Sequence, residues 1–104
     1  MTTPEAKVKA VVKQWFKDHH VWYFSPVSNG MGVHGIPDFI CCANGKFYGI
    51  ETKAPGKRNN VSAPQEFQMA AITAAGGKCA VVDNVNQLEG VFYADPERQT
   101  QLPS

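Results

Sequence analysis

The chain has 104 residues, enough for one packed domain and too few for two independent cores. A hydrophobic content of 43% excludes an intrinsically disordered chain, and a formal net charge of +1 excludes a uniformly basic surface, so any contact with nucleic acid must come from local clusters of Lys and Arg. The sequence shows neither a signal peptide nor the ~18 apolar residues that span a bilayer, so we expect a soluble intracellular protein without a membrane partner.

A first helix is predicted for residues 4–20. Thr3, Pro4 and Glu5 have the order of a capping hydroxyl, a proline in the first turn and an acid near the positive end of the helix dipole. Apolar residues then recur at helical spacing: Val8, Val11, Val12, Trp15 and Phe16. This pattern predicts an amphipathic helix whose lysines point mainly away from the apolar stripe.

Residues 21–27 are rich in β-branched and aromatic side chains and predict a first strand, which Pro26 brings to its end. Residues 28–35 are glycine-rich and predict a loop. Such a loop is flexible enough to become ordered around a bound ligand, although a plain connection would have the same composition.

A hairpin is predicted around Asn44 and Gly45, because Asn-Gly between the apolar runs 38–42 and 46–53 is a strong signal for a two-residue turn. The turn also sets the register of the two strands, since the residues on either side of it must pair with each other.

This register makes Asp38 and Glu51 a directly opposed pair, with β-carbons about 5 Å apart on one face of the sheet. Lys53 lies on the same face, two residues beyond Glu51. Three charged groups therefore converge where the strands meet the glycine-rich loop and the basic residues Lys57 and Arg58.

Both faces of the hairpin carry apolar side chains, as expected for strands that helices cover on two sides. The residues are Ile40, Cys42 and Phe47 on one face and Phe39, Cys41, Tyr48 and Ile50 on the other.

A second helix is predicted between the capping box of Ser62 and Gln65 and the terminating pair Gly76 and Gly77, with Pro64 in its first turn. Its close-packing stripe is predicted to consist of Phe67, Ala70, Ala71 and Ala74.

Residues 78–82 predict a fourth strand and residues 85–92 a short helix or a last irregular element, and a polar tail follows from about residue 96. We therefore expect one domain over residues 1–104. Its three cysteines include no CxxC pair, which argues against both a disulfide framework and a zinc knuckle.

Two carboxylates as close as Asp38 and Glu51 need a cation, and hard oxygen ligands with open positions suit Mg²⁺ or Mn²⁺, which activate water for attack on a phosphate. Lys53 beside them can orient that water or offset the charge that grows on the phosphate. The backbone carbonyl of Thr52 is a candidate further ligand. The ordinary alternative is that the two acids are surface charges at strand ends, with Lys53 paired to one of them.

The motifs that carry this chemistry resemble the VRR-Nuc branch of the PD-(D/E)xK nucleases over roughly residues 5–82. They are Gly35-Ile36-Pro37-Asp38, then Gly49-Ile50-Glu51-Thr52-Lys53, then Gln65 at the start of a helix. The resemblance implies an α/β (α+β) chain with a restriction-endonuclease-like α-β-β-β-α-β core, in which helices flank a mixed sheet of about four strands.

The resemblance also implies roles for individual residues. It places metal binding on Asp38 and Glu51, the service of the attacking water on Lys53, and a further site role on Gln65. An acid in the first helix often completes such a site, which maps to Glu5.

Two candidates keep ordinary alternatives. The capping box explains Gln65 without catalysis, and we expect that one rotamer cannot serve both the cap and the site. His34, just ahead of the first motif, is a candidate phosphate contact, but a histidine in a loop is often incidental.

The resemblance implies Mg²⁺- or Mn²⁺-dependent hydrolysis of DNA phosphodiesters. Lys57 and Arg58, which cluster with Lys53 in the sequence, are the expected DNA contacts. Small stand-alone members are similar to Holliday junction resolvases, so branched DNA, a homodimer and a cytoplasmic location in a bacterial or phage-infected cell are expected. A flap or nicking endonuclease, a nuclease with loose substrate choice, and a non-catalytic DNA-binding module are the alternatives.

Overall fold

The computed structural model describes residues 2–27 and 32–93. Its elements follow in the order α1 (Pro4–Asp18), β1 (Trp22–Phe24), β2 (Phe39–Ala43), β3 (Lys46–Thr52), α2 (Ala63–Ala74), β4 (Lys78–Val82) and α3 (Gln87–Tyr93). The predicted polar tail, and residues 28–31 of the predicted glycine-rich loop, lie outside the described residues. Within the described part of the chain, no helix has both the length and the apolar character needed to cross a bilayer.

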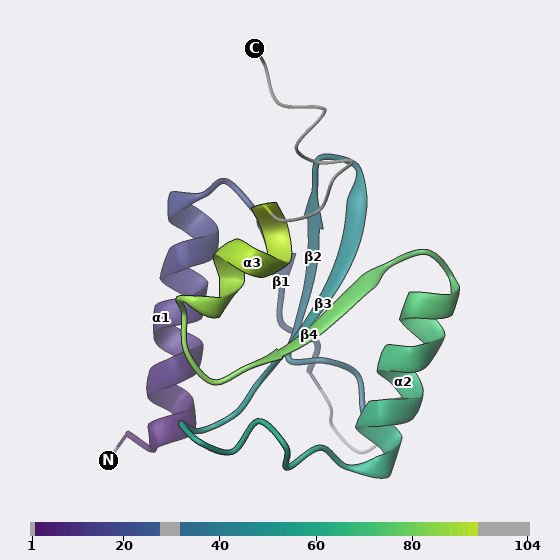
Figure 1. Ribbon diagram of the computed structural model, residues 1–104, viewed down its shortest axis with the longest axis horizontal. Helices are drawn as coiled ribbons and strands as arrows, with labels where there is room; N and C mark the ends of the chain where they lie inside the picture. Colours follow the sequence, from purple (N-terminus) through teal and green to yellow (C-terminus); the bar gives the residue numbers. More distant parts are fainter. Residues whose placement is uncertain (1, 28–31, 94–104) are drawn as a thin grey trace.

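The four strands form one mixed sheet in the order β1-β2-β3-β4, antiparallel except for the parallel pair of β3 and β4. Helix α2 is the crossover between these parallel strands. Figure 1 shows α1 and α3 on one side of the sheet and α2 on the other. The α/β class and the α-β-β-β-α-β order expected from the sequence are confirmed.

Helix α1 begins as predicted, with the Thr3 hydroxyl accepting a hydrogen bond from the backbone N–H of Ala6 at 3.1 Å. It ends at Asp18, two residues before the predicted end, because His20 adopts a left-handed φ of 57°. The N–H of Val21 then donates to the carbonyl of Phe16 at 2.9 Å, which is the six-to-one bond of a Schellman cap. The chain thus turns directly from α1 into the sheet.

The predicted hairpin register is confirmed. Asn44 and Gly45 have φ values of 52° and 77°, as a type I′ turn requires, and Ala43 pairs with Lys46 across it. The pairing continues without a bulge to the start of β2, so the start of β2 and the end of β3 lie side by side.

The strands differ from their predicted bounds at their ends. β1 is shorter than residues 21–27, because Val21 belongs to the cap of α1 and Pro26 lacks a donor for the ladder. β2 begins at Phe39 rather than at residue 38, because the N–H of Asp38 donates to the side chain of Glu51.

The main core lies between the sheet and the two helices α1 and α3. Buried hydrophobic residues from all these elements form it: Val12, Phe16, Phe39, Cys41, Tyr48, Ile50, Val82, Leu88 and Phe92. Tyr48 and Phe92 pack with their rings tilted and 4.3 Å between the centroids, and Phe16 meets Phe39 edge to face at 5.5 Å. This core supports β2 and β3 from the face of the sheet opposite to the Glu51 side chain.

The predicted packing stripe of α2 is wrong. Phe67 is 61% exposed, and Ala70, Ala71 and Ala74 are exposed as well. The partly buried residues of the helix are instead Gln65, Gln68, Met69 and Ile72, which also recur at helical spacing. Helix α2 is therefore rotated about its axis so that Gln65 faces the ends of the strands, and it covers its side of the sheet less completely than α1 and α3 cover theirs.

Candidate active site

The segment before β2 is packed against the first turn of α2. Gly35 has a φ of 87°, and a β-carbon built on it would overlap the carbonyl group of Pro64 and lie 2.7 Å from the backbone nitrogen of Gln65. Only glycine fits such an approach in that conformation. This contact holds the residues that lead into Asp38 close to the helix that carries Gln65.

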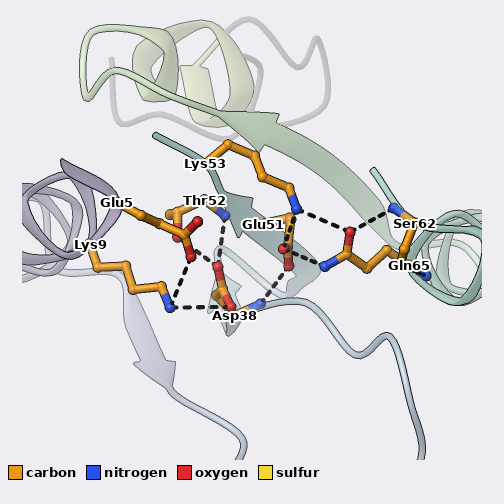
Figure 2. Close-up of polar contacts among 8 residues, drawn as sticks. All are labelled: Glu5, Lys9, Asp38, Glu51, Thr52, Lys53, Ser62 and Gln65. Carbon is orange, nitrogen blue, oxygen red and sulfur yellow. Dashed lines mark hydrogen bonds and ion pairs between the residues drawn. The ribbon is translucent and has the colours of Figure 1, made fainter. Parts of the chain in front are cut away.

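Asp38 is held by the end of β3. Its Oδ2 accepts hydrogen bonds from the backbone N–H of Thr52 at 3.0 Å and from the Thr52 hydroxyl at 2.6 Å. Its own N–H donates to Oε1 of Glu51 at 3.2 Å. The structure therefore brings the two predicted carboxylates together, as Figure 2 shows.

Glu51 is a buried carboxylate, with only 4% of the residue exposed. Its Oε2 accepts a hydrogen bond from Nε2 of Gln65 at 2.8 Å and lies 3.5 Å from Nζ of Lys53. Burial raises the pKa of Glu51, the neighbouring Asp38 carboxylate raises it further, and the Lys53 ammonium partly offsets both effects. Such a buried acid beside a second acid favours the approach of a cation.

One rotamer of Gln65 makes both the capping contact and contacts with Glu51 and Lys53, so the expectation that the two are exclusive is wrong. Its Oε1 accepts from the N–H of Ser62 at 3.0 Å, which closes the capping box, and from Nζ of Lys53 at 3.2 Å (Figure 2). Its Nε2 remains available to donate to Glu51. One rotamer suffices because an amide oxygen accepts two hydrogen bonds while the amide nitrogen points the other way.

Thr52 has a role that the sequence analysis missed. Its side chain is fully buried, and its hydroxyl and N–H both orient Asp38. A threonine between two charged residues gives no local sign of this contact, because its partner Asp38 lies just before the neighbouring strand β2. Metal binding by the Thr52 carbonyl stays a prediction.

Glu5 reaches the site through Lys9. The Lys9 ammonium lies 3.5 Å from Oε2 of Glu5 and 3.7 Å from Oδ1 of Asp38. Lys9 is partly buried and lies against a carboxylate of the strands, a contact that the expectation of lysines mainly away from the apolar stripe did not include. Its spacing of four residues from Glu5 indicates an intrahelical ion pair, but nothing in the sequence indicates the contact with Asp38.

The predicted DNA contacts lie outside this network. His34 and Lys57 are exposed, and Arg58 donates through Nε to the carbonyl of Val81 at 3.2 Å. The loop that carries Lys57 and Arg58, called the basic loop below, is held at the end of β4, since the N–H of Gly56 also donates to Asp83 at 2.8 Å.

The donor set fits a hard divalent cation. Within residues 2–27 and 32–93, no three His, Cys, Asp or Glu side chains form a metal-binding cluster. The site instead offers the oxygens of Asp38 and Glu51, with Glu5 at the edge of the network, and Mg²⁺ commonly binds one or two carboxylates while keeping several waters. Two ammonium groups, from Lys9 and Lys53, already lie against these oxygens, which shows that they attract cations.

Comparison with known proteins supports this description of the fold. No family model and no curated protein matches the sequence. A solved structure described as "VRR_NUC domain" is similar to the chain, with a TM-score of 0.66 and 20% sequence identity over 86% of this chain and 95% of that one. The fold implied by the sequence motifs is thereby confirmed: this chain has the fold of a VRR_NUC domain.

Proposed function

We propose that the chain is a nuclease of the VRR-Nuc type that hydrolyses DNA phosphodiester bonds with the help of Mg²⁺ or Mn²⁺. The observation that carries this proposal is the joined arrangement of Asp38, Glu51 and Lys53 at the ends of β2 and β3. The ordinary alternative, strand-end charges in solvent, does not account for a buried Glu51 or for the Gln65 side chain that binds both Glu51 and Lys53.

The carboxylates would hold the metal, with the Thr52 carbonyl and Glu5 as candidate further ligands. When bound, the ion would supply Lewis acidity toward a phosphate oxygen and toward water. Thr52 and the backbone of the strand ends keep the two carboxylates aligned, so little reorganisation is needed when substrate arrives.

Lys53 is the proposed catalytic cation. Its side chain is 12% exposed, and its ammonium is held between Oε1 of Gln65 and Oε2 of Glu51, so its position is fixed before DNA binds. From there it can orient the attacking water or offset negative charge on the phosphate in the transition state. Gln65 is a positioning residue in this scheme, because it binds Lys53 and Glu51.

Recognition of DNA is proposed to rest on phosphate contacts from Lys57, Arg58 and His34. We further propose that the preferred substrate is branched DNA and that the active form is a homodimer, since symmetric cleavage of a four-way junction requires two active sites. Loss of charge at Lys57 would then weaken binding to all DNA sequences alike and lower its dependence on salt.

The test is cleavage of labelled four-way junctions, flaps, nicked duplexes, plain duplexes and single strands by the wild type and by Asp38→Asn. We expect the wild type to cut with Mg²⁺ or Mn²⁺ and not with EDTA, and Asp38→Asn to be inactive with both metals. Preferential cutting of flaps would replace the junction proposal. Wild-type binding without cleavage of any substrate would instead indicate a non-catalytic DNA-binding module.

A further inference from the structure

The two lysines of the site differ in how they are held. Lys53 is 12% exposed and donates a hydrogen bond to Gln65 at 3.2 Å. Lys9 is 37% exposed, projects from α1, and touches its carboxylate partners only at the longer distances of 3.5 Å to Glu5 and 3.7 Å to Asp38. Lys53 is thus a fixed cation, and Lys9 can leave its place by rotating a flexible side chain into water.

Lys9 covers one particular oxygen. Thr52 holds Oδ2 of Asp38 with two hydrogen bonds, whereas Lys9 lies against Oδ1. Figure 2 shows the ammonium between the Glu5 and Asp38 carboxylates, on the opposite side of the site from Lys53. Oδ1 is therefore the Asp38 oxygen that Thr52 leaves to a cation, and in this structure the cation is Lys9.

A divalent ion bound to Oδ1 would lie within a few ångströms of the Lys9 ammonium. Like charges at that distance repel strongly in a partly buried site, where the screening of bulk water is reduced. Binding of the metal thus requires Lys9 to move out. The energy of its pairing with Asp38 and Glu5 then opposes metal binding.

Resting on the proposed metal site, we infer that Lys9 is an internal counter-ion of Asp38 that competes with the divalent metal and sets its affinity. Without metal, Lys9 reduces the repulsion between the carboxylates and stabilises the fold. With metal bound, the ion takes over this role and Lys9 no longer contributes.

Lys9→Met is the variant that tests the role of the charge, because it keeps the length and helix propensity of the side chain and removes the ammonium. We expect Mn²⁺ to bind about tenfold more tightly to this variant than to the wild type, because the substitution removes the repulsion between the ammonium and the ion at this short distance. Lys13→Met is the matched control, because Lys13 is an exposed lysine of the same helix and its loss changes the net charge equally. Lys9→Arg should keep the wild-type affinity.

Affinity is measured by calorimetric titration of the purified full chain with MnCl₂ at about 0.15 M salt, which screens long-range charge effects. Melting temperatures give a second readout that does not depend on activity. Lys9→Met should melt below the wild type in EDTA and together with it in saturating Mn²⁺. A lysine that merely supports the fold would lower both melting temperatures alike.

The outcomes separate this inference from the proposed function. If the wild type and Lys13→Met bind Mn²⁺ and Lys9→Met binds it no more tightly, the inference is overturned and the proposed metal site still stands. Measurable binding by Lys9→Met alone would support the inference in its strongest form. Absence of binding by all variants would overturn the inference together with the proposed metal site.

Discussion

Gly35→Ala is expected to destabilise the chain far more than an ordinary glycine substitution. The residue has a φ of 87°, and the new methyl group would overlap the carbonyl of Pro64 and come within 2.7 Å of the nitrogen of Gln65. A left-handed alanine costs roughly 1–2 kcal/mol, and forced overpacking against backbone costs typically about 1–3 kcal/mol more. The expected loss in free energy of unfolding is therefore about 2–5 kcal/mol.

Two other glycines separate these contributions. Gly45 has a φ of 77° but open space around its added β-carbon, so Gly45→Ala should lose only the conformational part. Gly32 has open space and no left-handed φ, so Gly32→Ala should be nearly neutral. The series therefore predicts a ranking, with Gly32→Ala closest to the wild type, then Gly45→Ala, then Gly35→Ala.

Thermal and urea unfolding of the four proteins in EDTA measure the ranking. For a domain of this size, about 1 kcal/mol shifts the melting temperature by roughly 4–8 °C, so Gly35→Ala should lower it by about 10 °C or more. Equal melting temperatures for Gly35→Ala and Gly45→Ala would refute the close packing of the Gly35 segment on α2, and with it the explanation of how Asp38 and Gln65 are brought together.

Three further predictions follow from individual groups. The pKa of Glu51 is raised above its ordinary 4.5, so its protonated form stabilises the metal-free fold at acid pH, and this contribution is lost as the pH rises through the raised pKa. Glu51→Gln should flatten that part of the pH dependence of the urea midpoint. An unchanged pH dependence would contradict this prediction. Cys42 is exposed, whereas burial raises the pKa of Cys41 to about 12. A thiol reagent should therefore modify Cys42 in the native protein and Cys41 only after unfolding. Equal modification rates for the two thiols would disprove the burial of Cys41. Asp83→Ala removes the acceptor of the Gly56 N–H, which should loosen the basic loop and weaken DNA binding several-fold in an anisotropy titration without changing Mn²⁺ affinity. Undiminished binding would show that the loop needs no such anchor.

The hairpin was predictable because its signal is local. Asn44 and Gly45 favour left-handed conformations, and the turn they form determines every pair along β2 and β3. The expected approach of Asp38 to Glu51 follows from that register and is confirmed by the hydrogen bond between them. A site built across a tight hairpin can thus be located from sequence.

The rotation of α2 was not predictable from periodicity, since apolar residues occur almost all round the helix. A stripe through Phe67 and one through Met69 and Ile72 have similar spacing, and the sequence contains no preference between them. In the observed orientation the Gln65 amide bonds to Glu51 and Lys53, and Phe67 is exposed. The orientation of the helix is thus compatible with polar contacts that the apolar pattern does not reveal.

The contacts of Lys9 and of the Thr52 hydroxyl with Asp38 were missed for a related reason. Both residues act on Asp38, which is distant from each of them in sequence and reaches them only once α1 and β3 are packed. Motif spacing therefore identifies the charged groups of the site, whereas their supporting contacts depend on tertiary structure.

The most direct test of the catalytic assignment compares the wild type with Lys53→Ala on one four-way junction, with cutting measured in Mn²⁺ and binding measured in Ca²⁺. Because Lys53 is assigned to the attacking water or to transition-state charge, its loss should reduce the cleavage rate by roughly 10²–10³-fold while DNA affinity and fold remain nearly unchanged. Gln65→Leu, which removes the positioning contact and leaves the ammonium, should fall between the two. Equal cleavage rates for the wild type and Lys53→Ala would contradict the account.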